Sequence, residues 1–229
     1  MNKVINVPSP NYNDRPPGTE IDILVIHYTG MVGLAEALER LCDPANEVSA
    51  HYLINQNGQI FQLISEEKRA WHAGVSSWRG NSNINDRSIG IELENPGHEF
   101  DYHKFPKLQI DSLIKLTKDL IIHHPIPARN IVGHSDIAPT RKKDPGEFFD
   151  WHKLALTGVG YWPEVLKSDD ITQINALNFE MALKIYGYDT TDLLATILAF
   201  QRHFLPKHCN DQPDLKMFRM LEILINNLE

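Results

Sequence analysis

The chain has 229 residues, of which 42% are hydrophobic and 23% are charged. These proportions are typical of a soluble globular protein and exclude a disordered, collagen-like or coiled-coil chain. The 22 Lys and Arg residues are outnumbered by 30 Asp and Glu residues, giving a net charge of -8. This balance gives the chain no overall positive charge that would attract a nucleic-acid backbone or an anionic membrane, so we expect no nucleic-acid partner.

The N-terminal segment lacks the apolar core and the small-residue cleavage site of an export signal. No apolar run approaches the ~18 residues of a transmembrane helix, so we expect no membrane span. Cys42 and Cys209 form no C-x-x-C pair. We expect two unpaired thiols, which do not fix the redox compartment.

The first part of the chain alternates strand-like and helix-like segments. A nearly continuous apolar run over residues 21–30 predicts a buried strand, with His27 near its C-terminal end. Residues 35–42 predict a short helix. Two apolar runs joined at Asn57 and Gly58 predict a β-hairpin with a type I′ turn.

The next segments lead to two further strand ends. Residues 71–87, rich in Gly, Ser and Asn, predict a long loop, and residues 88–93 predict a strand. Alternation along that strand places Glu92 on the face opposite to its isoleucines. Residues 107–124 have helical spacing, and the strand-like segment after them ends at His134.

The C-terminal part is predicted to be helical throughout. Residues 163–170 predict a linker, which divides the chain into a first domain over residues 1–165, with a leader over residues 1–20, and a helical domain over residues 171–229. Three apolar stripes predict three helices in the second domain, at Ile174, Leu177, Met181 and Ile185; Leu194, Ile197, Leu198 and Phe204; and Phe218, Leu221, Leu224 and Leu228.

Two histidines lie where an α/β sheet gathers its functional groups. His27 and His134 each stand at the C-terminal end of a predicted strand. A catalytic zinc site with two imidazoles needs a third protein ligand and an open position. Asp144 is the nearest candidate, and a set of unrelated residues is the alternative interpretation.

The segment around Asp144 reads RKKDPG. Pro145 biases Asp144 toward an extended backbone, in which residues two positions apart point to the same side. We therefore expect Lys142 and Asp144 to share one side, and Arg141 and Lys143 to point elsewhere as solvated charges.

These residues predict hydrolytic chemistry. Zinc lowers the pKa of its bound water toward ~7 and polarises a carbonyl, and Lys142 would neutralise the oxyanion that forms. Glu92 is the preferred proton carrier, because Glu94 shares its face but lies nearer the strand end. The sequence has no G-x-S-x-G, P-loop or H-E-x-x-H motif that would suggest a rival nucleophile or metal site.

Six motifs occur in order along the chain: VIHYT, SAHYLI, AWHAG, NDRSIGIELEN, GHSDIAP and RKKDPG. From about Ile21 to Pro163 the chain closely resembles the zinc-dependent N-acetylmuramoyl-L-alanine amidases of the AmpD and AmiD type. Its tail, with the motif ILAFQRHFLP, resembles the small three-helix peptidoglycan-binding domain of the AmiD type.

The resemblance implies an α/β fold, in which a mixed central β-sheet is flanked by helices and followed by a small C-terminal three-helix domain. It implies one zinc ion on His27, His134 and Asp144, with catalytic roles for Glu92 and Lys142. The implied reaction cleaves the amide between N-acetylmuramic acid, or its anhydro form, and L-alanine of peptidoglycan stem peptides. Peptidoglycan or muropeptide fragments are then the partners of a protein expected to be a monomer.

Five residues are expected to contact substrate. Trp71, His72 and Ala73 would line the groove, while Arg79 and Asn85 would meet peptide carboxylates or carbonyls. The alternatives are a core aromatic for Trp71 and a solvated loop for Arg79 and Asn85.

Other interpretations stay open. His51 is expected to have a structural role, and the alternative is that it is a metal ligand. A peptidoglycan recognition module of the same fold without turnover is a rival function, as is a metallo-amidase acting on another acyl-peptide bond; the complete set of ligands favours the amidase. The tail suggests the cell envelope or periplasm, whereas the absent export signal leaves the cytoplasm open.

Overall fold

The computed structural model describes residues 4–163 and 174–227 of the chain. The predicted linker over residues 163–170 lies outside the described residues except for Pro163. The predicted division into two domains therefore stays a prediction.

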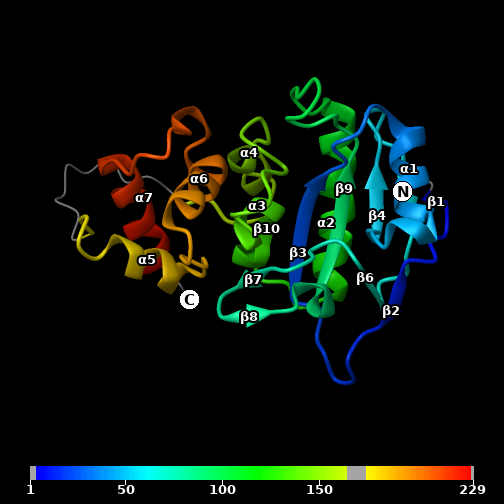
Figure 1. Cartoon of the computed structure of the whole chain (residues 1–229), viewed down its shortest axis with the longest axis horizontal. Helices are drawn as coiled ribbons and strands as arrows, with labels where there is room; N and C mark the ends of the chain where they lie inside the picture. Colours follow the sequence, from blue (N-terminus) through cyan, green and yellow to red (C-terminus); the bar gives the residue numbers. More distant parts are fainter. Residues whose placement is uncertain (1–3, 164–173, 228–229) are drawn as a thin grey trace.

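A six-stranded mixed sheet forms the centre of the molecule, as the resemblance implied (Figure 1). Its strands, in spatial order, are β1 (Ile5–Asn6), β5 (Ile60–Gln62), β4 (Tyr52–Ile54), β9 (Ser88–Leu93), β3 (Ile23–Tyr28) and β10 (Ile131–Gly133). Only β4 and β5 pair in antiparallel fashion within this sheet, and every other neighbouring pair is parallel. Two small sheets pair β2 (Tyr12–Asp14) with β6 (Lys68–Ala70), and β7 (Ser77–Trp78) with β8 (Asn81–Ser82).

The two faces of the sheet differ because side chains alternate along each strand. Ile89 and Ile91 of β9 share an apolar cluster with Leu113 of α2 (Lys107–His123), so α2 covers one face. On the other face, Leu53 packs with α1 (Leu34–Cys42), and Val25 packs in a cluster with α3 (His134–Ile137). This second face also carries the polar side chains that end β3 and β9.

The remaining helices are α4 (Trp151–Ala155), α5 (Phe179–Tyr186), α6 (Leu193–Phe204) and α7 (Leu215–Asn226), and 3-10 turns lie at Pro44–Asn46, Ile84–Arg87, Ala128–Asn130 and Pro206–His208. Within residues 4–163 and 174–227, no helix has both the length and the apolar character needed to cross a membrane.

The predicted hairpin forms, but its turn is not of type I′. A type I′ turn needs positive φ at both central residues, and only Gly58, at 78°, has it here, whereas Asn57 does not. The Asn55 side chain closes the turn instead, because its Oδ1 accepts the backbone N–H groups of Asn57 and Gln59. The preceding polar residue therefore stabilises a longer turn than the dipeptide alone indicated.

The C-terminal helices pack against the side of the sheet near β10 and α3 (Figure 1). Phe200 of α6 and Leu183 of α5 share a cluster with Val25 of β3 and Ile137 of α3. The helical region and the sheet therefore have a continuous apolar core.

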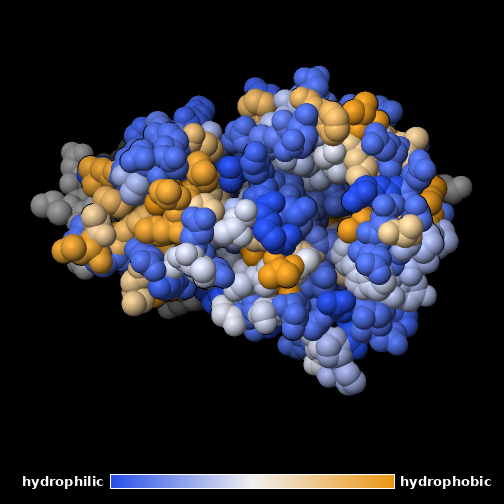
Figure 2. Space-filling view, viewed as in Figure 1, coloured by the Kyte–Doolittle hydropathy of each residue, from blue (hydrophilic) through white to orange (hydrophobic). Residues whose placement is uncertain are grey.

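Of the apolar stripe predicted for the first C-terminal helix, only Ile174 is buried, and it lies before α5 begins at Phe179. Leu177, Met181 and Ile185 are 97%, 60% and 52% exposed, whereas the adjacent stripe with Phe179 and Tyr186 is buried. Both stripes are apolar, and the larger aromatic surface is removed from water. Figure 2 shows hydrophobic residues gathered at the surface over these C-terminal helices.

Candidate active site

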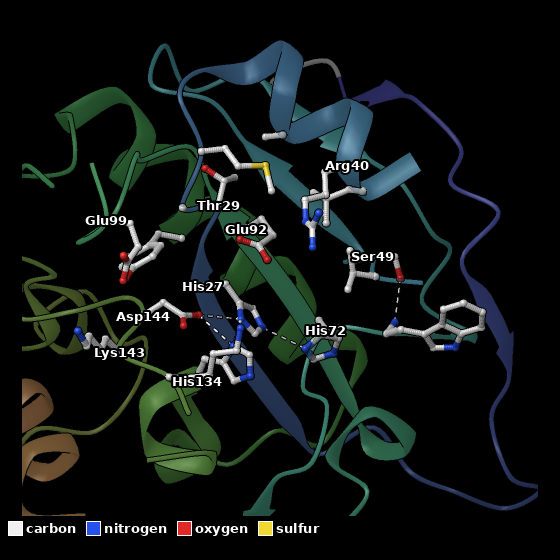
Figure 3. Close-up of a pocket in the computed structure, with 18 of the residues that line it drawn as sticks. His27, Thr29, Arg40, Ser49, His72, Glu92, Glu99, His134, Lys143 and Asp144 are labelled. Carbon is white, nitrogen blue, oxygen red and sulfur yellow. Dashed lines mark hydrogen bonds and ion pairs between the residues drawn. The ribbon is translucent and has the colours of Figure 1, made fainter. Parts of the chain in front are cut away.

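Two imidazoles and one carboxylate converge in a pocket of about 370 Å³ at the C-terminal end of β3 (Figure 3). His27 Nδ1 lies 2.9 Å from His134 Nδ1 and 3.0 Å from Asp144 Oδ2, and His134 Nδ1 lies 3.1 Å from the same oxygen. Among the described residues, these three are the group of His, Cys, Asp or Glu side chains close enough together to hold a metal ion. All three are buried.

The hydrogen bonds of His134 fix which ring nitrogen faces the pocket. Its Nε2 lies 3.1 Å from the backbone oxygen of Ala73, which can only accept. Nε2 therefore carries the proton, and in the neutral ring Nδ1 presents a lone pair toward His27 and Asp144.

A longer chain of hydrogen bonds fixes His27 in the same way. Ser88 donates its hydroxyl proton to the backbone oxygen of Ile84 (2.6 Å), so its oxygen accepts from His72 Nε2 (3.1 Å). His72 Nδ1 then accepts from His27 Nε2 (3.0 Å), which leaves a lone pair on His27 Nδ1. Burial, and next the charge of His134, lower the pKa of His27 to about 4, so the ring is neutral at pH 7.

These three lone-pair atoms fit a metal ion. A tetrahedral zinc with bonds of ~2.0–2.1 Å separates its ligand atoms by roughly 3.3 Å, and the three atoms here lie 2.9–3.1 Å apart. Three acceptors so close together repel one another unless a cation lies between them. Partners that orient the outer nitrogen of each imidazole, as Ala73 and His72 do, are typical of metal-ligating histidines.

Glu92 lies directly beside this group on the neighbouring strand. It is the in-register partner of His27 in the parallel pair of β3 and β9, so both side chains project from the same face. The carboxyl is half-buried and lines the pocket, and its Oε2 is buried without a hydrogen-bond partner. Burial, and next the charge of Asp144, raise its pKa well above the usual value, while Lys142 acts in the opposite direction.

The segment RKKDPG contributes more residues to the pocket than the two that were predicted. Lys142 and Asp144 both line it, but so do Arg141 and Lys143. The expected alternation appears in the burial of these residues, because Arg141 and Lys143 are exposed whereas Lys142 is half-buried and Asp144 is buried. Arg141 is also not a free surface charge, since its guanidinium donates to the backbone oxygens of the 73–75 loop.

The loop expected to contact substrate divides into two roles. Trp71 is half-buried at the pocket wall, and its Nε1 donates to Asn13 Oδ1 (3.0 Å). His72 touches the pocket but is buried beneath it, where it orients His27. A Cβ on Gly90 would approach the His72 ring to 2.4 Å, so only glycine leaves room for this imidazole over β9. Ala73 is buried and contributes its backbone oxygen to His134.

The structure does not bring Arg79 and Asn85 to the pocket. Arg79 is exposed beside a separate hollow near Asp22, and its backbone N–H donates to Gly187. Asn85 is buried, and its Oδ1 accepts the backbone N–H groups of His72 and Ala73. Its side chain thus shapes the loop from below, because the 3-10 turn that carries it faces the core.

Among the pocket residues that the sequence reasoning missed, two are charged. Arg40 on α1 and Glu99 line the pocket, both from exposed positions. Neither belongs to a motif, and charged side chains at exposed positions are common throughout protein surfaces whether or not a site lies near. His51, as expected, is structural: its Nδ1 accepts the Gly90 N–H (3.0 Å).

Two imidazoles, a carboxylate and an adjacent carboxyl of raised pKa in a half-open pocket are typical of a metal-dependent hydrolase. A family model described as N-acetylmuramoyl-L-alanine amidase matches residues 17–147. The chain therefore belongs to the N-acetylmuramoyl-L-alanine amidase family, and it is an amidase that acts on peptidoglycan.

Individual relatives agree with this placement. The chain is 38% identical over 230 residues to the N-acetylmuramoyl-L-alanine amidase AmiD of Escherichia coli (strain K12), covering 90% of this chain and 82% of the relative. It is 40% identical over 168 residues to the 1,6-anhydro-N-acetylmuramyl-L-alanine amidase AmpD of the same strain, and this match covers 66% of this chain and 89% of the relative. The solved complex of AmiD from E. coli with anhydro-N-acetylmuramic acid-L-Ala-D-gamma-Glu-L-Lys superposes with a TM-score of 0.82 at 36% identity, covering 93% of each chain.

Proposed function

We propose that this chain is a zinc-dependent amidase in which His27, His134 and Asp144 hold one zinc ion, and Glu92 and Lys142 carry the catalysis. The observation that supports this most strongly is the convergence of three lone-pair atoms at one point of the pocket, where both imidazoles are oriented by hydrogen bonds of their outer nitrogens. When bound, zinc supplies a Lewis acid that polarises a carbonyl and lowers the pKa of water.

The substrate amide joins the lactyl group of N-acetylmuramic acid, or of its anhydro form, to L-alanine of the stem peptide. Glu92 takes a proton from the attacking water and returns it to the departing alanine nitrogen, so the products are a free carboxylic acid and a free amine. Its raised pKa suits both steps, because a carboxyl with an ordinary pKa would be a weaker base and a poor acid near pH 7.

Lys142 lines the same pocket as Glu92, and its charge partly opposes the rise that burial causes in the pKa of Glu92. Its ammonium group would stabilise the negative charge that develops on the carbonyl oxygen. Trp71, half-exposed at the wall, offers an aromatic surface to the sugar ring. Arg40 and Lys143 on the rim give the pocket a cationic surface for the carboxylates of a stem peptide.

The test is release of stem peptide from a purified anhydromuropeptide. We expect a new peptide with a free L-alanine amino terminus, loss of the activity after treatment with a chelator, and recovery on addition of about one equivalent of zinc per chain. Binding of muropeptide without release of peptide by the zinc-loaded protein would instead indicate a recognition module.

A further inference from the structure

A second buried carboxylate lies on the helix that carries His134. Asp136 is 1% exposed, and three donors surround it. Its Oδ2 accepts from the Gly133 backbone N–H (2.7 Å) and from His203 Nδ1 (2.8 Å), and its Oδ1 accepts from the Tyr188 hydroxyl (2.7 Å). Tyr188 and His203 come from the C-terminal helical region, so that region makes buried polar contacts with the helix that bears a metal ligand.

The same C-terminal histidine packs against the segment that supports the site. The His203 ring stacks on Trp151 at 4.0 Å between centroids and an interplanar angle of 12°. A Cβ on Gly133 would come within 3.3 Å of the Trp151 ring and 2.7 Å of Pro145 Cδ. Because residue 133 is a glycine, Pro145 can pack directly against the backbone next to His134.

A backbone hydrogen bond connects the two ligand-bearing segments further. The Ser135 N–H donates to the backbone oxygen of Asp144 (2.9 Å). The positions of His134 and Asp144 are therefore coupled, and a displacement of α3 would alter both. Asp136, held by Tyr188 and His203, ties α3 to the C-terminal helices.

We propose that the C-terminal helical region is a clamp for the metal site, and that Tyr188 and His203 are positioning residues that hold α3, and with it His134, in ligating geometry. The proposal rests on the proposed zinc site. It gives this region a role inside the catalytic unit, in addition to the polymer binding that its resemblance implies.

The motif of the tail supports an internal role. His203 and Gln201 of this motif are 6% and 2% exposed. Gln201 Oε1 accepts the backbone N–H groups of Asn210 and Asp211, while its amide nitrogen donates to the backbone oxygen of Gln212. These two polar residues of the motif are therefore occupied within the molecule, one with the loop after α6 and the other with α3.

Four substitutions in the full chain test the clamp. Tyr188→Phe removes one of the three donors to Asp136, and His203→Phe removes a second while keeping a ring to stack on Trp151. His203→Asn is the rescue variant, because its amide can still donate near the position of Nδ1. Tyr186→Phe is the matched control, since it removes a buried hydroxyl of the same region that makes no hydrogen bond to Asp136.

The main measurement is zinc affinity by competition with a chromophoric chelator, followed by kcat and KM on an anhydromuropeptide. We expect Tyr188→Phe and His203→Phe each to weaken zinc binding by about 10-fold or more, as loss of outer partners does at other metal sites. kcat should fall with KM changed much less, and His203→Asn and Tyr186→Phe should remain close to wild type.

The clamp proposal would be overturned if folded Tyr188→Phe and His203→Phe bound zinc as tightly as the wild type. It would also be overturned if Tyr186→Phe lost as much zinc affinity as these two variants. If His203→Phe fails to fold, Tyr188→Phe decides, because it removes a single hydroxyl. If the wild-type protein binds zinc but leaves the amide intact, only the proposed function is overturned, because the zinc affinities of the variants still test the clamp. A wild-type protein that binds no zinc would overturn both.

Discussion

Two buried carboxylates lie on the same short stretch of chain and have opposite surroundings. Asp136 accepts from a backbone N–H, a hydroxyl and an imidazole N–H, so its charge is fully paired with donors. Asp144 faces two imidazole nitrogens whose protons lie on the far side of each ring. The first carboxylate needs nothing further, whereas the second lies in a group that only a cation can complete.

The contrast separates two uses of the same residue type. A buried carboxylate that is surrounded by donors stabilises a particular packing arrangement, because losing any partner leaves a charge uncompensated. A buried carboxylate surrounded by acceptors stores a local repulsion that a bound ion relieves. Burial alone does not distinguish them, since both side chains are almost completely inaccessible.

Replacing each of the two carboxylates with an amide tests this contrast directly, and the substitution at Asp144 should have the largest effect. Asp144→Asn should abolish zinc binding and lower turnover to roughly a thousandth or less, because one of three ligands is lost. The zinc-free form should be at least as stable as wild type, since the amide can donate to an imidazole. Calorimetric zinc titration and thermal unfolding of the zinc-free protein check both parts.

Asp136→Asn should behave in the opposite way. Its amide nitrogen would face N–H donors, so we expect the free energy of unfolding to fall by about 3 kcal/mol. Zinc should still bind, more weakly. If Asp144→Asn proved the more destabilising of the two in the absence of zinc, the distinction between donor-paired and acceptor-paired carboxylates would be wrong.

Glu92 extends the comparison to a third carboxyl, which has an unpaired oxygen and lies beside the acceptor group. Glu92→Gln keeps the size but cannot carry a proton, so kcat should fall by about 100- to 10,000-fold while zinc affinity changes little. Because burial raises the pKa of Glu92, ionisation opposes folding at neutral pH. Removing that ionisation should raise the stability of the zinc-free protein by about 1 kcal/mol.

The outcome that would contradict this role is near-normal turnover by zinc-loaded Glu92→Gln. Asp111→Asn offers a matched control: it neutralises an exposed carboxylate whose partner is Lys107 on the surface of α2, and it should leave both kcat and stability close to wild type.

The strands that carry the site were predictable from the sequence because their signals are local. The apolar run before His27, the alternation around Glu92 and the strand before His134 each lie within one element, and all three appear where expected. Their convergence follows from parallel pairing, which brings the C-terminal ends of β3, β9 and β10 to one edge. The candidate metal-ligand group was thus predicted from strand ends together with a family resemblance.

What the sequence could not give depends on packing between distant segments. Periodicity allowed either of two apolar stripes on α5 to face inward, and the structure buries the aromatic one. Asn85 and Ala73 were expected to meet substrate, but their polar atoms are used to hold the loop and His134. Such hydrogen bonds join residues far apart in sequence, so no local pattern reveals them.

The smallest expected effect concerns His51, a buried histidine that lies beside the cation of Arg15. His203, by contrast, lies beside the carboxylate of Asp136. Burial, and next the charge of Arg15, lower the pKa of His51 to about 3. Its Nδ1 accepts the Gly90 N–H, so protonation would place two donors against each other. Between about pH 6.5 and 3 the unfolded chain binds a proton that the folded chain does not, so stability falls as the pH falls through this range.

From pH 7.0 to 5.5 this single group should cost about 1.3 kcal/mol of the free energy of unfolding. Urea unfolding of zinc-free wild type and His51→Asn at both pH values isolates the contribution, because all other titrating groups are shared. The difference between the two proteins should shrink by that amount at the lower pH. Equal pH dependence in both would mean that His51 is protonated as readily in the folded protein as in the unfolded chain, and that the neighbouring cation and the Gly90 N–H do not keep its ring neutral.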